Sequence, residues 1–174
     1  FCSREGYCLI KIYKFLRKNK NFAKPIYFKT SRRLATVTSF TSEKDIYNSF
    51  KFHRFFGSFR DLLKNRFNVK VFHGDLNKNI IVNTRKNIKP VKFLLKPYIT
   101  QILNNARRER KSYLNYLKNI VNFKKDKIAL VDNSFYGTAQ SSLIKITKKI
   151  FFGFYFSCNT DNKNKFFKNK KYGF

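Results

Sequence analysis

A polar turn at residues 132–140 carries the residue types that could bind an anion. It follows a short apolar run, residues 128–131, whose length and composition predict a buried strand. From Thr138 the sequence has helical character to about residue 150. The first amides of a helix lack backbone partners and lie at the positive end of its dipole. A strand, a turn and a helix start in this order therefore predict an anion site at the turn.

Two further polar clusters follow segments that are predicted to be strands, residues 1–3 and residues 26–28. The clusters are Arg4-Glu5-Gly6 and Ser31-Arg32-Arg33. In an open α/β sheet, ligands bind outside the carboxyl ends of the strands. If the three strands are parallel, all three polar clusters lie on one edge of the sheet. We therefore expect them to form a single crevice.

The expected ligand of this crevice is a phosphorylated sugar or a nucleotide-sugar. Arg4, Arg32 and Arg33 would neutralise its phosphate, because the guanidinium fork matches phosphate oxygens. The Gly137 amide and Thr138 would add donors at the helix start. The other residues of the expected ligand-binding set are Gly6, Ser31, Tyr136 and Gln140.

Two carboxylates belong to the same expected crevice. Asp132 and Glu5 are the candidate catalytic residues, and they would hold sugar hydroxyls or a divalent ion such as Mg²⁺. Glu109 and Arg110, on a predicted helix, are expected to support the site. The reaction itself is not indicated by these residues.

Each candidate also has a plain structural interpretation. Asp132 at a strand end is more often a turn or helix cap than a catalytic group. Gly137 could serve only to supply a positive φ, and Arg32 and Arg33 could be solvated surface residues. Glu109 and Arg110 could form a simple helix-face pair. The histidines, His53 and His73, lack partners at metal-ligand spacing, and no zinc-like spacing or phosphate-binding glycine loop occurs.

The order of predicted elements indicates an α/β protein with a Rossmann-like layered fold and a mainly parallel sheet. Helices are predicted at residues 7–18 and, with a break near Pro97, at residues 91–123, and residues 151–157 are predicted to be the last strand. We expect one domain over residues 1–157. It would contain a helical insertion, rather than sheet, at about residues 41–67. Residues 158–174 are expected to be a basic, polar tail.

The formal net charge of +30 allows two interpretations. Excess Lys and Arg is typical of RNA-binding or ribosomal proteins, which gives an alternative function. The abundance of Lys, Asn, Ile, Tyr and Phe is equally what an A/T-rich genome would produce. Basic residues are spread through every segment, which favours the second interpretation.

The remaining bulk properties indicate a reduced, cytoplasmic protein. Three Cys residues, an odd number without metal-like spacing, predict free thiols. No apolar run approaches the roughly 20 residues of a transmembrane helix. The chain starts at Phe1 and contains no Met, so we expect it to be an internal part of a longer protein.

Five short segments, taken in order, resemble one family. It comprises predicted hydrolases of the haloacid dehalogenase (HAD) superfamily that are linked to bacterial capsule and surface-polysaccharide synthesis, often with a glycosyltransferase. The family has an Arg-Asp-Gly-Tyr turn, a Tyr-rich strand ending in Ser-Arg-Arg, and a Glu-Arg-x-x-Tyr-Leu-x-Tyr-Leu helix. A Val-Asp turn leading to Gly-Thr-x-Gln and a Gly-aromatic-Tyr strand follow. The similar segments here are residues 4–7, 27–33, 109–117, 131–140 and 153–156.

The resemblance implies a companion domain of such a protein, with an upstream HAD-like or glycosyltransferase domain as its partner. A HAD phosphotransferase needs an Asp-x-Asp nucleophile motif, and this chain has none. Glu5 replaces the family's Asp, and Asn133-Ser134 replaces an apolar residue and Gly. Whether this domain is an enzyme, associated with hydrolysis or with glycosyl or phosphoryl transfer, is therefore left open.

Overall fold

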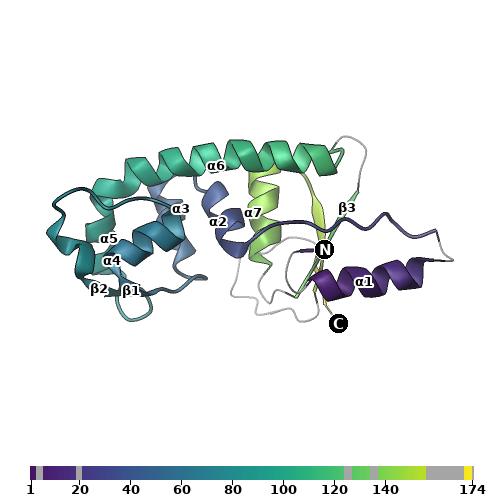
Figure 1. Ribbon diagram of the computed structural model, residues 1–174, viewed down its shortest axis with the longest axis horizontal. Helices are drawn as coiled ribbons and strands as arrows, with labels where there is room; N and C mark the ends of the chain where they lie inside the picture. The colour runs from purple at the N-terminus through teal and green to yellow at the C-terminus, as the bar shows by residue number, and fades with distance from the viewer. Residues whose placement is uncertain (3–5, 19–20, 124–126, 134–136, 156–170, 174) are drawn as a thin grey trace. The chain divides into compact units, whose positions relative to one another are not determined.

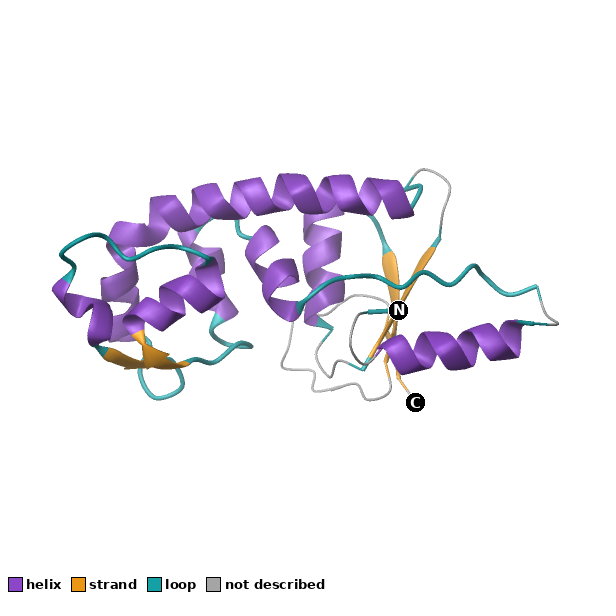
Figure 2. Ribbon diagram, viewed as in Figure 1, coloured by secondary structure: helices purple, strands orange, loops and turns teal. Residues whose placement is uncertain are grey.

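The computed structural model describes residues 1–2, 6–18, 21–123, 127–133, 137–155 and 171–173, and it shows a mixed α/β protein (Figures 1 and 2). The chain divides into two compact units. Unit 1 contains Phe1–Ala35 and Leu114–Phe174, and unit 2 contains Thr36–Tyr113. Unit 2 is therefore inserted into the sequence of unit 1. Among the described helices, none combines the length and the apolarity that crossing a bilayer requires.

Three parallel strands form the sheet of unit 1. They are β3 (Ile128–Asp132), β4 (Phe151–Tyr155) and β5 (Lys171–Gly173), and β4 lies in the middle. Leu130 pairs with Gly153, and Gly153 pairs with Lys171. The chain crosses from β3 to β4 through a helix, which is the connection that parallel neighbours require.

The N-terminal residues lie beside β3. The Cys2 amide donates a hydrogen bond to the Val131 carbonyl at 2.9 Å. On its other side, Cys2 forms an isolated parallel bridge with Phe28, and the Phe28 amide donates to the Phe1 carbonyl at 2.8 Å. The backbone at Cys2 therefore lies between β3 and the segment at Phe28.

Two helices of unit 1 agree with the predicted ones. Helix α1 (Gly6–Arg17) packs through Gly6 and Ile10, and the Tyr13 hydroxyl donates to the Ala23 carbonyl at 2.9 Å. Helix α7 (Thr138–Thr147) connects β3 to β4. It ends at Lys148, which adopts a left-handed conformation with φ of 57°.

Replacing Gly153 by Ala is expected to destabilise unit 1 by roughly 1–3 kcal/mol. A Cβ at this position would lie 2.6 Å from Gln140 Oε1 and 2.8 Å from the Tyr155 hydroxyl, both held in the interior. Denaturant unfolding measures the change. Ala129→Ser is the control, because it also adds one heavy atom, at an exposed position of β3. Equal effects of the two changes would contradict the close packing at Gly153.

Unit 2 is mainly helical. Helices α2 (Arg32–Thr38) and α6 (Ile99–Ile120) cross the boundary between the units. The elements between them are α3 (Glu43–Ser49), β1 (Phe56–Ser58), α4 (Phe59–Asp61), η1 (Leu62–Phe67), η2 (Leu76–Asn79), β2 (Ile81–Asn83), α5 (Lys89–Leu95) and η3 (Lys96–Tyr98). The predicted break near Pro97 is confirmed, since η3 separates α5 from α6.

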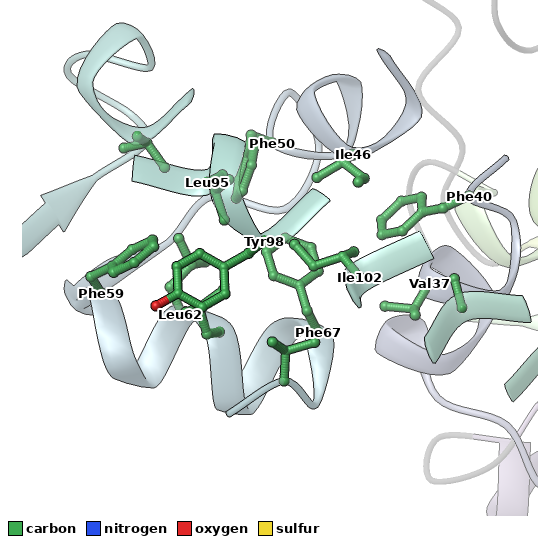
Figure 3. Packing of buried hydrophobic residues seen from close by; sticks show 14 of the residues in the cluster. Val37, Phe40, Ile46, Phe50, Phe59, Leu62, Phe67, Leu95, Tyr98 and Ile102 are labelled. Carbon is green, nitrogen blue, oxygen red and sulfur yellow. The ribbon is translucent and has the colours of Figure 1, made fainter. Parts of the chain in front are cut away.

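Unit 2 has its own hydrophobic core (Figure 3). Phe67 lies at its centre, with its ring centroid 6.2 Å from that of Phe40 and 6.1 Å from that of Phe50. The Tyr98 ring packs edge-on against Phe59 at 5.6 Å. These side chains come from segments throughout unit 2, so the insertion is a folded body in its own right.

Two strands lie where the sequence does not predict them. The insertion at about residues 41–67 is expected to be helical. In the structure it contains strand β1, which pairs antiparallel with β2, with Gly57 opposite Val82. The inserted unit also extends beyond residues 41–67 to Thr36–Tyr113. In the expected tail, residues 158–170 and 174 lie outside the described residues, while Lys171–Gly173 form a strand of the sheet.

Removing the Tyr98 hydroxyl is expected to change how unit 2 responds to acid. This hydroxyl donates to Asp75 Oδ2 at 2.5 Å, and with the Asn77 amide it lowers the pKa of Asp75 below the ordinary value of 3.8. A carboxyl with a lowered pKa stabilises the fold above its unfolded pKa, and the contribution is lost as pH falls through the folded pKa. Tyr98→Phe should raise the pKa of Asp75 and remove this part of the acid dependence.

An NMR pH titration of Asp75 in the variant measures this pKa. Tyr47→Phe is the matched control, because the Tyr47 hydroxyl donates to a different carboxylate, Glu43, also at 2.5 Å. Burial, together with that bond, raises the pKa of Tyr47 to about 12. A pKa of Asp75 that stays low in Tyr98→Phe would show that the hydroxyl is not its cause.

Candidate functional site

The carboxyl ends of the strands in unit 1 define the candidate site. Cys2 is hydrogen-bonded to Val131 on one side and forms a parallel bridge with Phe28 on the other. Segments that follow parallel strands emerge at the same edge of a sheet. If β3 runs in the same direction as the Cys2 and Phe28 segments, the polar residues after Phe28 and those after Val131 lie at one edge. Arg4, Glu5 and Tyr136 lie outside the described residues.

Ser31 is the N-cap of α2, as its position in the sequence predicts. Its hydroxyl accepts a hydrogen bond from the Leu34 amide at 3.0 Å, and its carbonyl accepts one from the Ala35 amide. Arg32 and Arg33 are the first two residues of the helix. Arg32 is exposed and Arg33 is half-buried. The cap fixes where these two side chains leave the backbone.

Tyr116 positions the end of the segment that leads to Ser31. Its hydroxyl accepts a hydrogen bond from the Lys29 amide at 2.9 Å, and its ring stacks on Phe28 with 6.0 Å between centroids. Tyr116 is not among the site residues expected from the sequence. The sequence contains a signal that could have indicated this role, because Tyr116 lies in the Glu-Arg-x-x-Tyr-Leu-x-Tyr-Leu segment of α6.

The second wall of the candidate site is the turn between β3 and α7. Asp132 is the last residue of β3 and is half-buried. Gly137 precedes α7 with φ of 63° and ψ of 29°, a left-handed conformation that favours glycine. Among the described residues, no side-chain hydrogen bond caps the helix start. The amides of the first turn of α7 lie at the positive end of the helix dipole.

The Gln140 side chain forms hydrogen bonds in the interior of unit 1. The side chain is fully buried: its Nε2 donates to the Phe151 carbonyl at 2.7 Å, and its Oε1 accepts from the Tyr155 hydroxyl at 2.9 Å. From the sequence, Gln140 is expected in the ligand-binding set. In the structure its amide instead connects α7 to β4, which makes it a positioning residue for the helix start.

Glu109 and Arg110 form bonds within unit 2. Glu109 Oε1 accepts from Asn105 Nδ2 at 3.2 Å. Arg110 donates from Nε to the Thr38 carbonyl at 2.6 Å and from its terminal nitrogen to the Phe40 carbonyl. Burial lowers the pKa of Arg110. Arg110 thus satisfies carbonyls at and just after the end of α2, which a simple helix-face pair with Glu109 would not do.

The described residues contain no group of three His, Cys, Asp or Glu side chains that could hold a metal ion. His53 is buried, with its Nε2 2.9 Å from the Thr36 hydroxyl oxygen. Cys2 and Cys8 form no disulfide. The chemistry that the described site offers is therefore anion binding by arginines and helix amides, next to one carboxylate, Asp132.

The chain was compared with known proteins. It matches no protein-family model, and a search of curated proteins finds no significant relative.

Proposed function

We propose that unit 1 is a Rossmann-like domain that binds a phosphorylated sugar or a nucleotide-sugar at the carboxyl edge of its sheet. The observation that carries the proposal is that Cys2 is hydrogen-bonded to Val131 on one side and forms a parallel bridge with Phe28 on the other. This pairing supports a continuous parallel layer in place of separate short strands. It also brings the polar segments that follow the strands toward one edge.

The order of the strands supports a doubly wound layer. In chain order the strands are the segments at Cys2 and Phe28, then β3, β4 and β5. Their lateral order is the Phe28 segment, the Cys2 segment, β3, β4 and β5. This is the order 2-1-3-4-5. In folds with this order the ligand binds between the first and third strands, where the connections from the two strands run to opposite sides of the sheet. In this chain that point lies between Cys2 and β3.

The residues around this point would bind the two parts of the ligand. Arg32 and Arg33 at the start of α2 would pair with phosphate oxygens, and the Gly137 and Thr138 amides would donate to the same group. Asp132, at the end of β3, would accept hydrogen bonds from sugar hydroxyls or hold Mg²⁺ beside the phosphate. Arg4 and Glu5, which follow the first strand in sequence, would complete the crevice.

The proposed family is that of the capsule-associated, HAD-like predicted hydrolases. What supports it is the succession of five similar segments, together with the strand order above. The proposed partner is an upstream HAD-like or glycosyltransferase domain of a longer chain. In this proposal the catalytic nucleophile belongs to that domain, and unit 1 binds the sugar substrate.

Replacing both Arg32 and Arg33 by Gln is expected to weaken the binding of UDP-glucose by at least about tenfold, because two charge-assisted bonds to phosphate are lost. Isothermal titration calorimetry measures the affinity. Inorganic phosphate, titrated in parallel, should compete with UDP-glucose. The proposal would be wrong if the wild-type chain bound neither compound.

Arg85→Gln with Lys86→Gln is the matched control. This neighbouring basic pair is exposed on unit 2, and its replacement removes the same net charge. It should leave the affinity for UDP-glucose unchanged. Equal loss in both double variants would mean that net charge alone attracts the ligand.

The net charge of +30 supports one other candidate, a basic RNA-binding protein. Every helix that the structure describes contains at least one Lys or Arg, in both units. This even distribution counts against a dedicated nucleic-acid face. Binding to single-stranded RNA that falls steeply between low and moderate salt, without any affinity for UDP-glucose, would favour this candidate.

A further inference from the structure

Helix α1 exposes an apolar band. Phe15 is 71% exposed, Ile12 and Leu16 are each 57% exposed, and Cys8 is also exposed. Their positions, i, i+4, i+7 and i+8, lie on one face of a helix. We call these four residues the α1 band. Single exposed apolar residues are common on proteins, but four on one helical face need an explanation.

The α1 band is separate from the face through which α1 packs against the rest of unit 1. Gly6 and Ile10 are buried on the opposite face, and Tyr13 on that side donates its hydroxyl to the Ala23 carbonyl. Arg17 Nε donates to the Phe22 carbonyl at 2.9 Å. The helix therefore already packs against unit 1 through one face, and the α1 band is a second apolar face.

Basic residues lie near the α1 band. Lys11, Lys14 and Lys18 are exposed. Helical geometry places Lys11 next to Phe15, while Lys14 lies nearer to Ile10 and Lys18 follows the end of the helix. The Lys11 ammonium also lies 4.5 Å from the centre of the Tyr7 ring. An apolar strip beside exposed lysines fits a partner that is apolar inside and negatively charged on its surface.

We propose that α1 lies in the surface of an anionic lipid bilayer, with the α1 band in the acyl boundary and the exposed lysines, Lys11 foremost, among the headgroups. The helix has 12 residues, so it could lie along the interface but could not span the bilayer. Aliphatic Ile12 and Leu16 disfavour a nucleic acid, because they cannot stack on bases as aromatic rings do. A second copy of this basic chain would bring like charges together.

Vesicle co-sedimentation of the 174-residue chain tests the proposal. The probe is phosphatidylserine–phosphatidylcholine vesicles, with pure phosphatidylcholine vesicles alongside. The chain should bind the anionic vesicles, and Phe15→Ser with Leu16→Ser should weaken this binding by about tenfold or more. Moderate salt should weaken the binding of the wild-type chain as the lysine contribution is screened.

Phe93→Ser with Leu76→Ser is the matched control. It removes the same two side-chain types, which are 78% and 93% exposed in unit 2. It should leave vesicle binding unchanged. Equal loss in both double variants, or no binding of the wild-type chain to anionic vesicles, would overturn the proposal. So would a Phe15→Ser, Leu16→Ser variant that binds vesicles normally but has lost self-association or RNA binding.

Discussion

Replacing Gln140 by Met is expected to destabilise the chain by roughly 2–5 kcal/mol, because two buried partners lose their hydrogen bonds. The change keeps the length and volume of the side chain. It leaves the Phe151 carbonyl and the Tyr155 hydroxyl without the Gln140 amide to which each is bonded. Denaturant unfolding at neutral pH measures the free energy of unfolding.

The control for Gln140→Met is Ser142→Ala, a half-buried polar change on the same helix, which should cost much less. A double-mutant cycle with Tyr155→Phe gives a sharper test. Removing the Tyr155 hydroxyl should cost less in the Gln140→Met background, because its partner is already gone. Strictly additive effects would contradict the direct bond between these two side chains.

Replacing Phe67 by Ala is expected to destabilise unit 2 by roughly 3–5 kcal/mol, from lost burial and the cavity that remains. Phe67 is fully buried between the rings of Phe40 and Phe50 (Figure 3). Unfolding followed by the near-ultraviolet signal of the aromatic residues measures the loss.

Phe56→Ala is the matched control for Phe67→Ala. It removes the same ring from an exposed position of β1 in the same unit, and it should change the unfolding free energy by about 0.5 kcal/mol or less. If both variants lost the same stability, the core of unit 2 would not be organised around Phe67.

The elements with strong local signals could be predicted from the sequence. Helix α1 has an apolar face at helical spacing, and Ser31 has the polar side chain and the position of an N-cap. Strand β3 is a short apolar run that ends at Asp132. Each of these signals arises from residues close together in the chain, so no tertiary partner is needed to recognise them.

Elements that depend on distant partners could not be predicted. Strands β1 and β2 are three residues each, and neither has a clear apolar alternation; the pairing of Gly57 with Val82 joins segments 25 positions apart. Strand β5 lies in a Lys-rich stretch and is defined by its pairing with β4. Tertiary pairing overrides weak local propensity in both cases.

The candidate site could be predicted in outline but not in the role of each side chain. The sequence indicates which polar residues follow strands. It does not indicate that Gln140 faces the interior or that Arg110 reaches the Thr38 carbonyl. Helical periodicity indicates where a polar side chain lies on a helix. It does not distinguish a side chain that binds a ligand from one that joins two elements.

NMR mapping of amide shifts is the most direct test of the proposed crevice. UDP-glucose would be added to the isotope-labelled 174-residue chain. We expect the largest shifts to fall together on residues 31–33 and 137–139, the helix starts that follow the Phe28 segment and β3. Shifts confined to one of these segments, or spread over the lysines of both units without either segment, would contradict a shared crevice at the carboxyl edge of the sheet.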